Sequence, residues 1–149
     1  MYTALLAALL AAPPGLDPAA LRTGDILLHT SRGGQAPAIA WATGSVYTHV
    51  GLVERTGDRV SVIEAVQPVR RTPLGEWLAR GVGGHATALR HPDLDEAGRA
   101  AVAAAAARYL GRPYDLAFSP GDDAIYCSEL VHLAYSVVGL TVGAWQPAG

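Results

Sequence analysis

The chain has 149 residues, which is enough for one domain with a hydrophobic core of its own. Half of the residues are hydrophobic and 16% are charged, a composition that excludes intrinsic disorder. The net charge is −2, and all eleven basic residues are scattered arginines, so we expect no nucleic-acid partner. The single cysteine excludes an intrachain disulfide and a multi-cysteine metal site.

Residues 1–12 form an apolar run that ends at Pro13-Pro14-Gly15. The run is shorter than the ~20 residues of a transmembrane helix, so we expect no transmembrane segment. Its length suits either a packed helix or the core of an export signal, although no basic residue precedes it. We therefore divide the chain into 1–15, an apolar helix or weak signal-like segment, and 16–149, a single domain. The location, in the cytoplasm or exported to the cell envelope, and the oligomeric state stay open.

The rest of the chain alternates short apolar segments with Gly and Pro turns. We expect a hairpin of two β-branched strands, and strands joined by a hairpin rather than by crossovers indicate an antiparallel sheet with helices packed on it, the α+β class. The predicted elements are a helical turn at 16–21, strands at 26–29, 49–54, 60–65 and 85–90, and helices at 37–42, 73–80, 93–110 and 127–138.

Cys127 stands at the predicted start of the last helix. Free backbone N–H groups and the positive end of the helix dipole favour a thiolate there. A thiolate is the nucleophilic form of cysteine. The alternative is a buried, inert cysteine that acts as a small hydrophobic residue.

A thiolate nucleophile usually works with an imidazole, and His49 is the candidate because it opens an apolar strand. His132 lies five residues after Cys127, about 140° away around the helix, so the two side chains diverge. His85 and His91 are expected on the solvated surface, and His29 ends a strand and is expected to be half-buried.

The hairpin brings a carboxylate to His49. If Glu54 pairs with Arg59, then His49 lies opposite Glu64, and a register two residues away keeps the two side chains on one face as diagonal neighbours. A carboxylate in an apolar strand needs a partner, and a His–Glu pair would fix the imidazole tautomer. The alternative is an unrelated strand-end histidine and edge glutamate.

Four strings of the sequence resemble one known family. They are Thr23–Leu28 (TGDILL), Tyr47–Val53 (YTHVGLV), Val62–Ala65 (VIEA) and Tyr126–Val131 (YCSELV). In this order, together with Gly111-Arg112-Pro113-Tyr114, they are similar to the permuted NlpC-type papain-like cysteine peptidases, the YiiX-like (YebB-like) proteins. Tyr126 and Glu129 replace the Asp and Gly that flank Cys-Ser in ordinary NlpC-type members.

The resemblance implies a circularly permuted papain-like fold, with an antiparallel sheet or half-barrel, packed helices and the nucleophile at a helix N-terminus. It makes 16–149 a catalytic domain with Cys127 as nucleophile, His49 as general base and acid, and Glu64 as the orienting residue. Tyr114 matches a tyrosine of the family's substrate cleft, and Tyr126 and Tyr47 are further candidate substrate-binding residues. The Cys127 N–H is a candidate oxyanion donor.

The resulting hypothesis is a thiol hydrolase that cleaves a small peptide or amino-acid amide, with the cell wall as one source, through an acyl-enzyme. Two alternatives are kept: a lipid-directed thiol acyltransferase or esterase at the same site, and a non-catalytic binding domain of the same fold. We expect no cofactor and no metal, because the chain has no HExxH motif and no histidines at ligand spacing.

Overall fold

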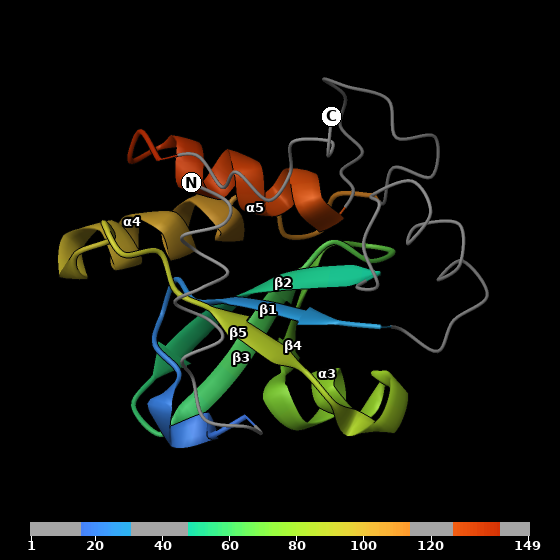
Figure 1. The fold of residues 1–149 in the computed structure, drawn as a ribbon. Coiled ribbons are helices and arrows are strands. Elements are labelled where there is room, and N and C mark those ends of the chain that lie inside the picture. The colour runs from blue at the N-terminus through green and yellow to red at the C-terminus, as the bar shows by residue number, and fades with distance from the viewer. Residues whose placement is uncertain (1–15, 31–47, 114–126, 141–149) are drawn as a thin grey trace, which may run out of the picture.

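A computed structural model describes residues 16–30, 48–113 and 127–140. The described strands form one five-stranded antiparallel sheet, in the order β4-β3-β2-β1-β5 (Figure 1). The strands are β1 (Ile26–His29), β2 (His49–Thr56), β3 (Arg59–Glu64), β4 (Arg70–Pro73) and β5 (Thr87–Leu89).

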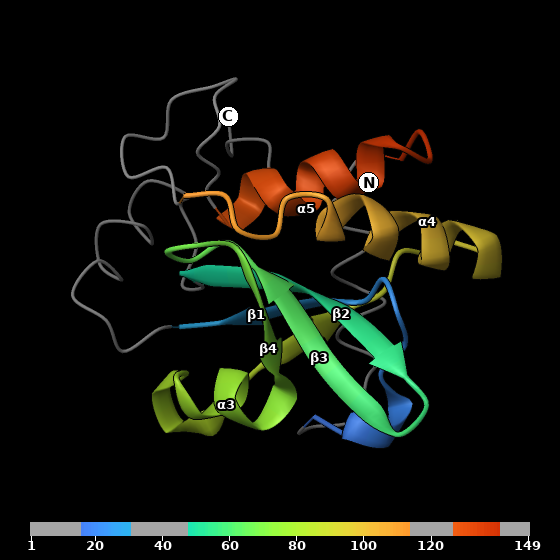
Figure 2. The ribbon, with the colours of Figure 1, turned by 180° about the vertical axis from the view of Figure 1, so that it is seen from behind.

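Helices cover both faces of this sheet. α4 and α5 lie over one face, and α3 lies against the other, as both views show (Figures 1 and 2). The bounds are α3 (Leu74–Ala79), α4 (Glu96–Ala107) and α5 (Cys127–Ser136), with 3₁₀ turns η1 (Pro18–Ala20) and η2 (Val82–Gly84). The predicted α+β class is therefore confirmed.

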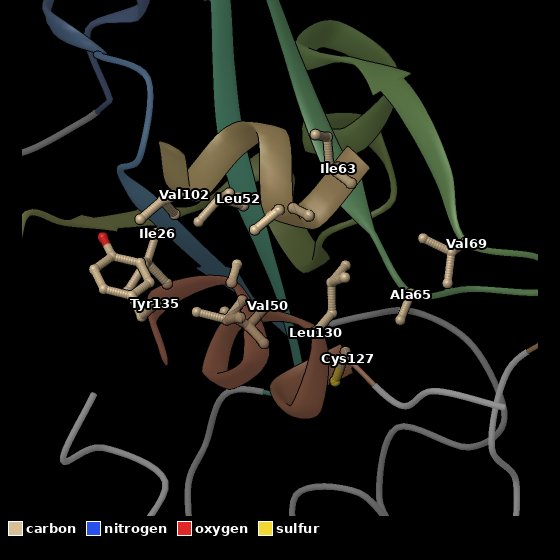
Figure 3. Close-up of a cluster of buried hydrophobic side chains, with 14 of the residues drawn as sticks. Ile26, Val50, Leu52, Ile63, Ala65, Val69, Val102, Cys127, Leu130 and Tyr135 are labelled. Carbon is tan, nitrogen blue, oxygen red and sulfur yellow. The ribbon is translucent and has the colours of Figure 1, made fainter. Parts of the chain in front are cut away.

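Each face of the sheet has its own hydrophobic cluster. Between the sheet and the α4–α5 layer, strand residues such as Val50, Leu52 and Ile63 pack with Leu130 and Cys127 of α5 (Figure 3). On the other face, Leu27, Val53 and Val62 pack with Leu74 and Trp77 of α3. The alternation of side chains along β2 thus divides its residues between two cores.

The helices lie where they were predicted, but their lengths differ from the predicted ones. α4 begins later than predicted, because Asp95 is its N-cap and its side chain accepts a 2.7 Å hydrogen bond from the Gly98 N–H. β5 is shorter than the predicted strand, and α3 and α5 lie inside the predicted helices.

The sequence prediction missed β4 altogether. Arg70–Pro73 is polar and ends in proline, so it lacks the apolar alternation of a strand. It forms as the edge strand, where proline is tolerated because one side of the strand needs no hydrogen-bond partner.

Several predictions lie outside the described residues. They are the apolar segment 1–15, the helix at 37–42 and the candidate substrate-binding residues Tyr47, Tyr114 and Tyr126. Among the helices that the structure describes, none is long and apolar enough to cross a membrane.

Candidate active site

The β2–β3 hairpin brings His49 and Glu64 together in a register that differs from the one we predicted. Thr56 pairs with Arg59, so the turn has two residues, and Gly57 takes a φ of 61° that a tight turn requires. The prediction assumed a longer loop and was wrong by two positions. Because side chains alternate with period two, His49 and Glu64 still share a face, as diagonal neighbours. His49 Nε2 lies 2.7 Å from Glu64 Oε1.

Glu64 is a fully buried carboxylate with several polar partners. Thr72 Oγ1 of β4 donates to Oε2, and Arg80 Nη2, just after α3, donates to both carboxylate oxygens. Burial acts to raise the pKa of Glu64, but the hydrogen bonds from His49, Arg80 and Thr72 outweigh burial and hold this pKa at about 2. Glu64 is therefore ionised throughout the physiological pH range.

Cys127 approaches His49 from the helix layer. It is the first residue of α5, and its side chain is 5% exposed at the end of the core (Figure 3). Its side chain acts on His49, because the interaction with Cys127 is one of the two that raise the pKa of His49. Since Nε2 of His49 faces Glu64, Nδ1 is the nitrogen that remains for the sulfur.

The charge state of His49 follows from these two neighbours. Burial acts to lower the pKa of His49, but the interactions of its ring with Cys127 and with the Glu64 carboxylate outweigh burial and raise the pKa to about 9. The imidazole therefore holds its proton at neutral pH. The arrangement can support a thiolate beside an imidazolium, the pair that makes a cysteine reactive.

His29 is part of this surrounding, and sequence reasoning placed it wrongly as half-buried. It is 1% exposed, pairs with His49 across β1 and β2, and its ring centroid lies 5.3 Å from that of His49. Its ring also stacks on Trp77, with the two centroids 4.0 Å apart. Burial, together with the charges of His49 and Arg80, lowers the pKa of His29 to about 4, so His29 is neutral at pH 7.

Sequence reasoning did not assign three residues to this site: His29, Thr72 and Arg80. Antiparallel pairing of the strand at 26–29 with that at 49–54 would have found His29 opposite His49. Thr72 lies on the strand that was missed, and Arg80 had no feature to separate it from other surface arginines. His85 is exposed, as expected, and His132 is exposed too, whereas His91, which was expected on the solvated surface, is partly buried.

A family model described as "Permuted papain-like amidase enzyme, YaeF/YiiX, C92 family" matches residues 20–147. The chain belongs to this family. The fold is accordingly a permuted papain-like fold, as the sequence resemblance implied.

Relatives from Escherichia coli agree with this assignment. The chain is 41% identical over 127 residues to "Uncharacterized protein YiiX" of strain K12, and the match covers 84% of this chain and 63% of that protein. The chain thus spans less than two thirds of the length of this curated relative. A crystal structure of "metalloprotein yiiX" from Escherichia coli O157:H7 superposes with a TM-score of 0.76 at 41% identity, over 81% of this chain and 68% of the other.

Proposed function

We propose that this chain is a thiol hydrolase that cleaves an amide through an acyl-enzyme on Cys127, with His49 as general acid and base and Glu64 as the orienting residue. The observation that carries the proposal is the position of His49. Its Nε2 lies 2.7 Å from a buried, ionised glutamate, and the sole cysteine is the other group that raises its pKa. The membership in a family of amidases supports the same reaction class.

In the first half of the reaction, the Cys127 thiolate attacks the amide carbonyl carbon and a C–S bond forms. The negative charge moves to the carbonyl oxygen, and the backbone N–H at the start of α5 is a donor for it. The His49 imidazolium then gives its proton to the amide nitrogen, the C–N bond breaks, and the amine leaves.

In the second half, neutral His49 takes a proton from water, and the oxygen of that water attacks the thioester carbon. The C–S bond then breaks, the carboxylic acid leaves, and the thiolate–imidazolium pair is restored. Glu64 stays ionised throughout. It fixes the ring and stabilises the imidazolium, as the aspartate does in a Ser-His-Asp triad.

The crystal structure of the relative is described as that of a metalloprotein. Within 16–30, 48–113 and 127–140 of this chain, no group of three or more His, Cys, Asp or Glu side chains could hold a metal ion. The described residues do not fit a resident metal, and the proposed reaction has no step through one.

The first test is the rate of Cys127 alkylation by iodoacetamide as a function of pH, in the wild type and in His49→Ala. Cys127 is the only thiol, so each labelling event reports on it, and Cys127→Ala is the blank. The labelling rate rises in a step at the pH where the thiol loses its proton. In the wild type we expect fast labelling whose first step lies well below the ordinary pKa of ~8.5, and in His49→Ala a single step near 8.5. A wild-type profile that starts near 8.5 and does not change in His49→Ala would overturn the proposal.

For the substrate, we propose the amide of a small peptide or amino acid, of which cell-wall stem peptides are one source. The test compares hydrolysis of a set of stem-peptide amides with that of a long-chain acyl ester. Turnover of the peptide amides that is lost in Cys127→Ala supports the proposal. Turnover of the long-chain ester without turnover of any peptide amide would contradict it and favour a lipid-directed esterase.

A further inference from the structure

The site holds two potential anions, the Cys127 thiolate and the Glu64 carboxylate, on either side of one imidazolium. Both are almost completely buried, and a buried charge is costly unless it is compensated. If His49 were the only cation, its single positive charge would serve both anions. A second positive charge is therefore needed for the thiolate to form easily.

Glu64 is surrounded by charged and polar groups from several strands and helices. His49 of β2 and Thr72 of β4 donate to it, and Arg80 contacts both of its oxygens. Arg70 of β4 reaches Oε2 only at 3.5 Å, and its side chain is 50% exposed. The remaining neighbours of the imidazole are neutral His29 of β1 and Cys127 of α5.

Helix α3 places Arg80 at this point. Trp77 is fully buried against the sheet and stacks on His29, which anchors the helix. Arg80 follows three residues later and caps the helix end, so that it lies close to the same helix face as Trp77. Its guanidinium thereby reaches Glu64 from the face of the sheet opposite to α5.

Building on the proposed function, we propose that Arg80 is a positioning residue of the site. It compensates and orients the Glu64 carboxylate, which leaves the positive charge of His49 available to Cys127. With Arg80 in place, His49 and Arg80, both at hydrogen-bond distance of Glu64, compensate the two anions, while the half-exposed Arg70 stays at 3.5 Å. An arginine suits this role because its guanidinium is always charged and donates several hydrogen bonds to a carboxylate.

The test is the first step of the iodoacetamide profile in Arg80→Met. This variant leaves the site one charge more negative, which disfavours the second anion, so the step moves up by about one pH unit. Arg80→Lys keeps the charge and returns the step towards the wild type. In Glu64→Gln/Arg80→Met both charges are gone, and the step lies close to that of the wild type.

The matched control is Arg71→Met. Arg71 of β4 forms an ion pair with Glu54 at 2.5 Å, and both side chains are partly exposed. Since neighbouring strand residues point to opposite faces, Arg71 points away from the face on which Thr72 meets Glu64. Its labelling step should not move. If Arg80→Met does not fold, the double variant is compared with Glu64→Gln alone. Glu64→Gln keeps the charge of Arg80 and so has one cation in excess. The first labelling step should therefore lie at a higher pH in the double variant than in Glu64→Gln.

A first step that is the same in Arg80→Met and in the wild type, or the same in the double variant and in Glu64→Gln, would overturn this inference. A shift that Arg80→Lys does not reverse would overturn it as well. These outcomes leave the proposed function standing as long as the wild-type step is low and depends on His49. A wild-type step near 8.5 would instead mean that the proposed function itself has failed.

Discussion

His49 contacts Glu64 along a diagonal of the β2–β3 hairpin, while the residue directly opposite the glutamate is Gly51. The register Leu52 to Ile63 extends by one pair to Gly51 and Glu64. Because Gly51 has no side chain, Val62 and Trp77 occupy the space beside it. A Cβ at this position would meet Val62 Cγ1 at 2.3 Å and Trp77 Nε1 at 3.4 Å.

We expect Gly51→Ala to destabilise the fold and disturb the site together. The added methyl group has to displace Val62 in a fully buried cluster, and overpacking of this kind costs about 1–3 kcal/mol. Chemical denaturation measures the free energy of unfolding, and iodoacetamide labelling reports on the site. Gly75→Ala, where a Cβ meets nothing within 4 Å, is the matched control. Wild-type stability in Gly51→Ala would contradict the close contact.

Glu64→Gln tests how far the charge of His49 depends on the carboxylate. The pKa of His49 should fall from about 9 by roughly one unit or more, because a neutral amide stabilises the imidazolium less. NMR of histidine labelled in the ring follows this titration directly. Hydrolysis should slow, and the alkaline limb of its pH profile should move down with the pKa. An unchanged His49 titration would remove Glu64 from its proposed role.

Cys127→Ala separates a reactive cysteine from a structural one. Hydrolysis should be abolished, because no other thiol is present to form the acyl-enzyme. The melting curve should change little, since alanine keeps most of the small buried side chain. Retained activity combined with a large loss of stability would mean that Cys127 serves only to pack the core.

The low pKa of His29 predicts an acid-sensitive fold. Its pKa is about 4 in the folded protein against 6.5 when unfolded, so on acidification the unfolded chain takes up a proton first. This contribution to stability is complete above pH 6.5 and is lost between about 6.5 and 4. Near pH 5 the loss is about 2 kcal/mol. Glu64 adds its own loss only below about 4.5, as its pKa in the fold is about 2.

His29→Phe should remove most of the loss between pH 6.5 and 5, since phenylalanine can still stack on Trp77 but does not titrate. Urea denaturation at several pH values checks this, with the exposed His132→Phe as control. His49 acts in the opposite direction. Its contribution is complete below 6.5 and is lost as the pH rises through about 9. A pH dependence that is the same with and without His29 would show that another group is responsible.

A substitution at Tyr135 should lower the stability of the fold without affecting the site. This buried residue of α5 donates its hydroxyl to the Gly24 carbonyl, next to β1. Tyr135→Phe leaves that carbonyl without its donor and should cost about 1–2 kcal/mol. Thermal melting should shift down by roughly 2–4 °C per kcal/mol, while the labelling step of Cys127 stays in place. A shift of the labelling step would mean that this contact positions α5 for the reaction.

Local patterns in the sequence determined most of the elements and the three central residues. The apolar segments predicted β1, the β2–β3 hairpin and the α+β class, because alternation and glycine turns act over a few residues. Cys127 and His49 stood out because each begins a helix or strand and lies within a string typical of the family. The proximity of His49 to Glu64 followed from the parity of the strands, which a register error of two positions does not change.

Only the tertiary structure decided what surrounds His49 and Glu64. Arg80 comes from the end of α3, Thr72 from an edge strand with no apolar pattern, and His29 from a strand that is separated in sequence from β2. Their contacts with Glu64 and His49 depend on how α3 and β4 pack on the sheet, and packing across long sequence separations leaves no local pattern. The same holds for the charges, because the pKa of a buried group is set by its neighbours in space rather than in sequence.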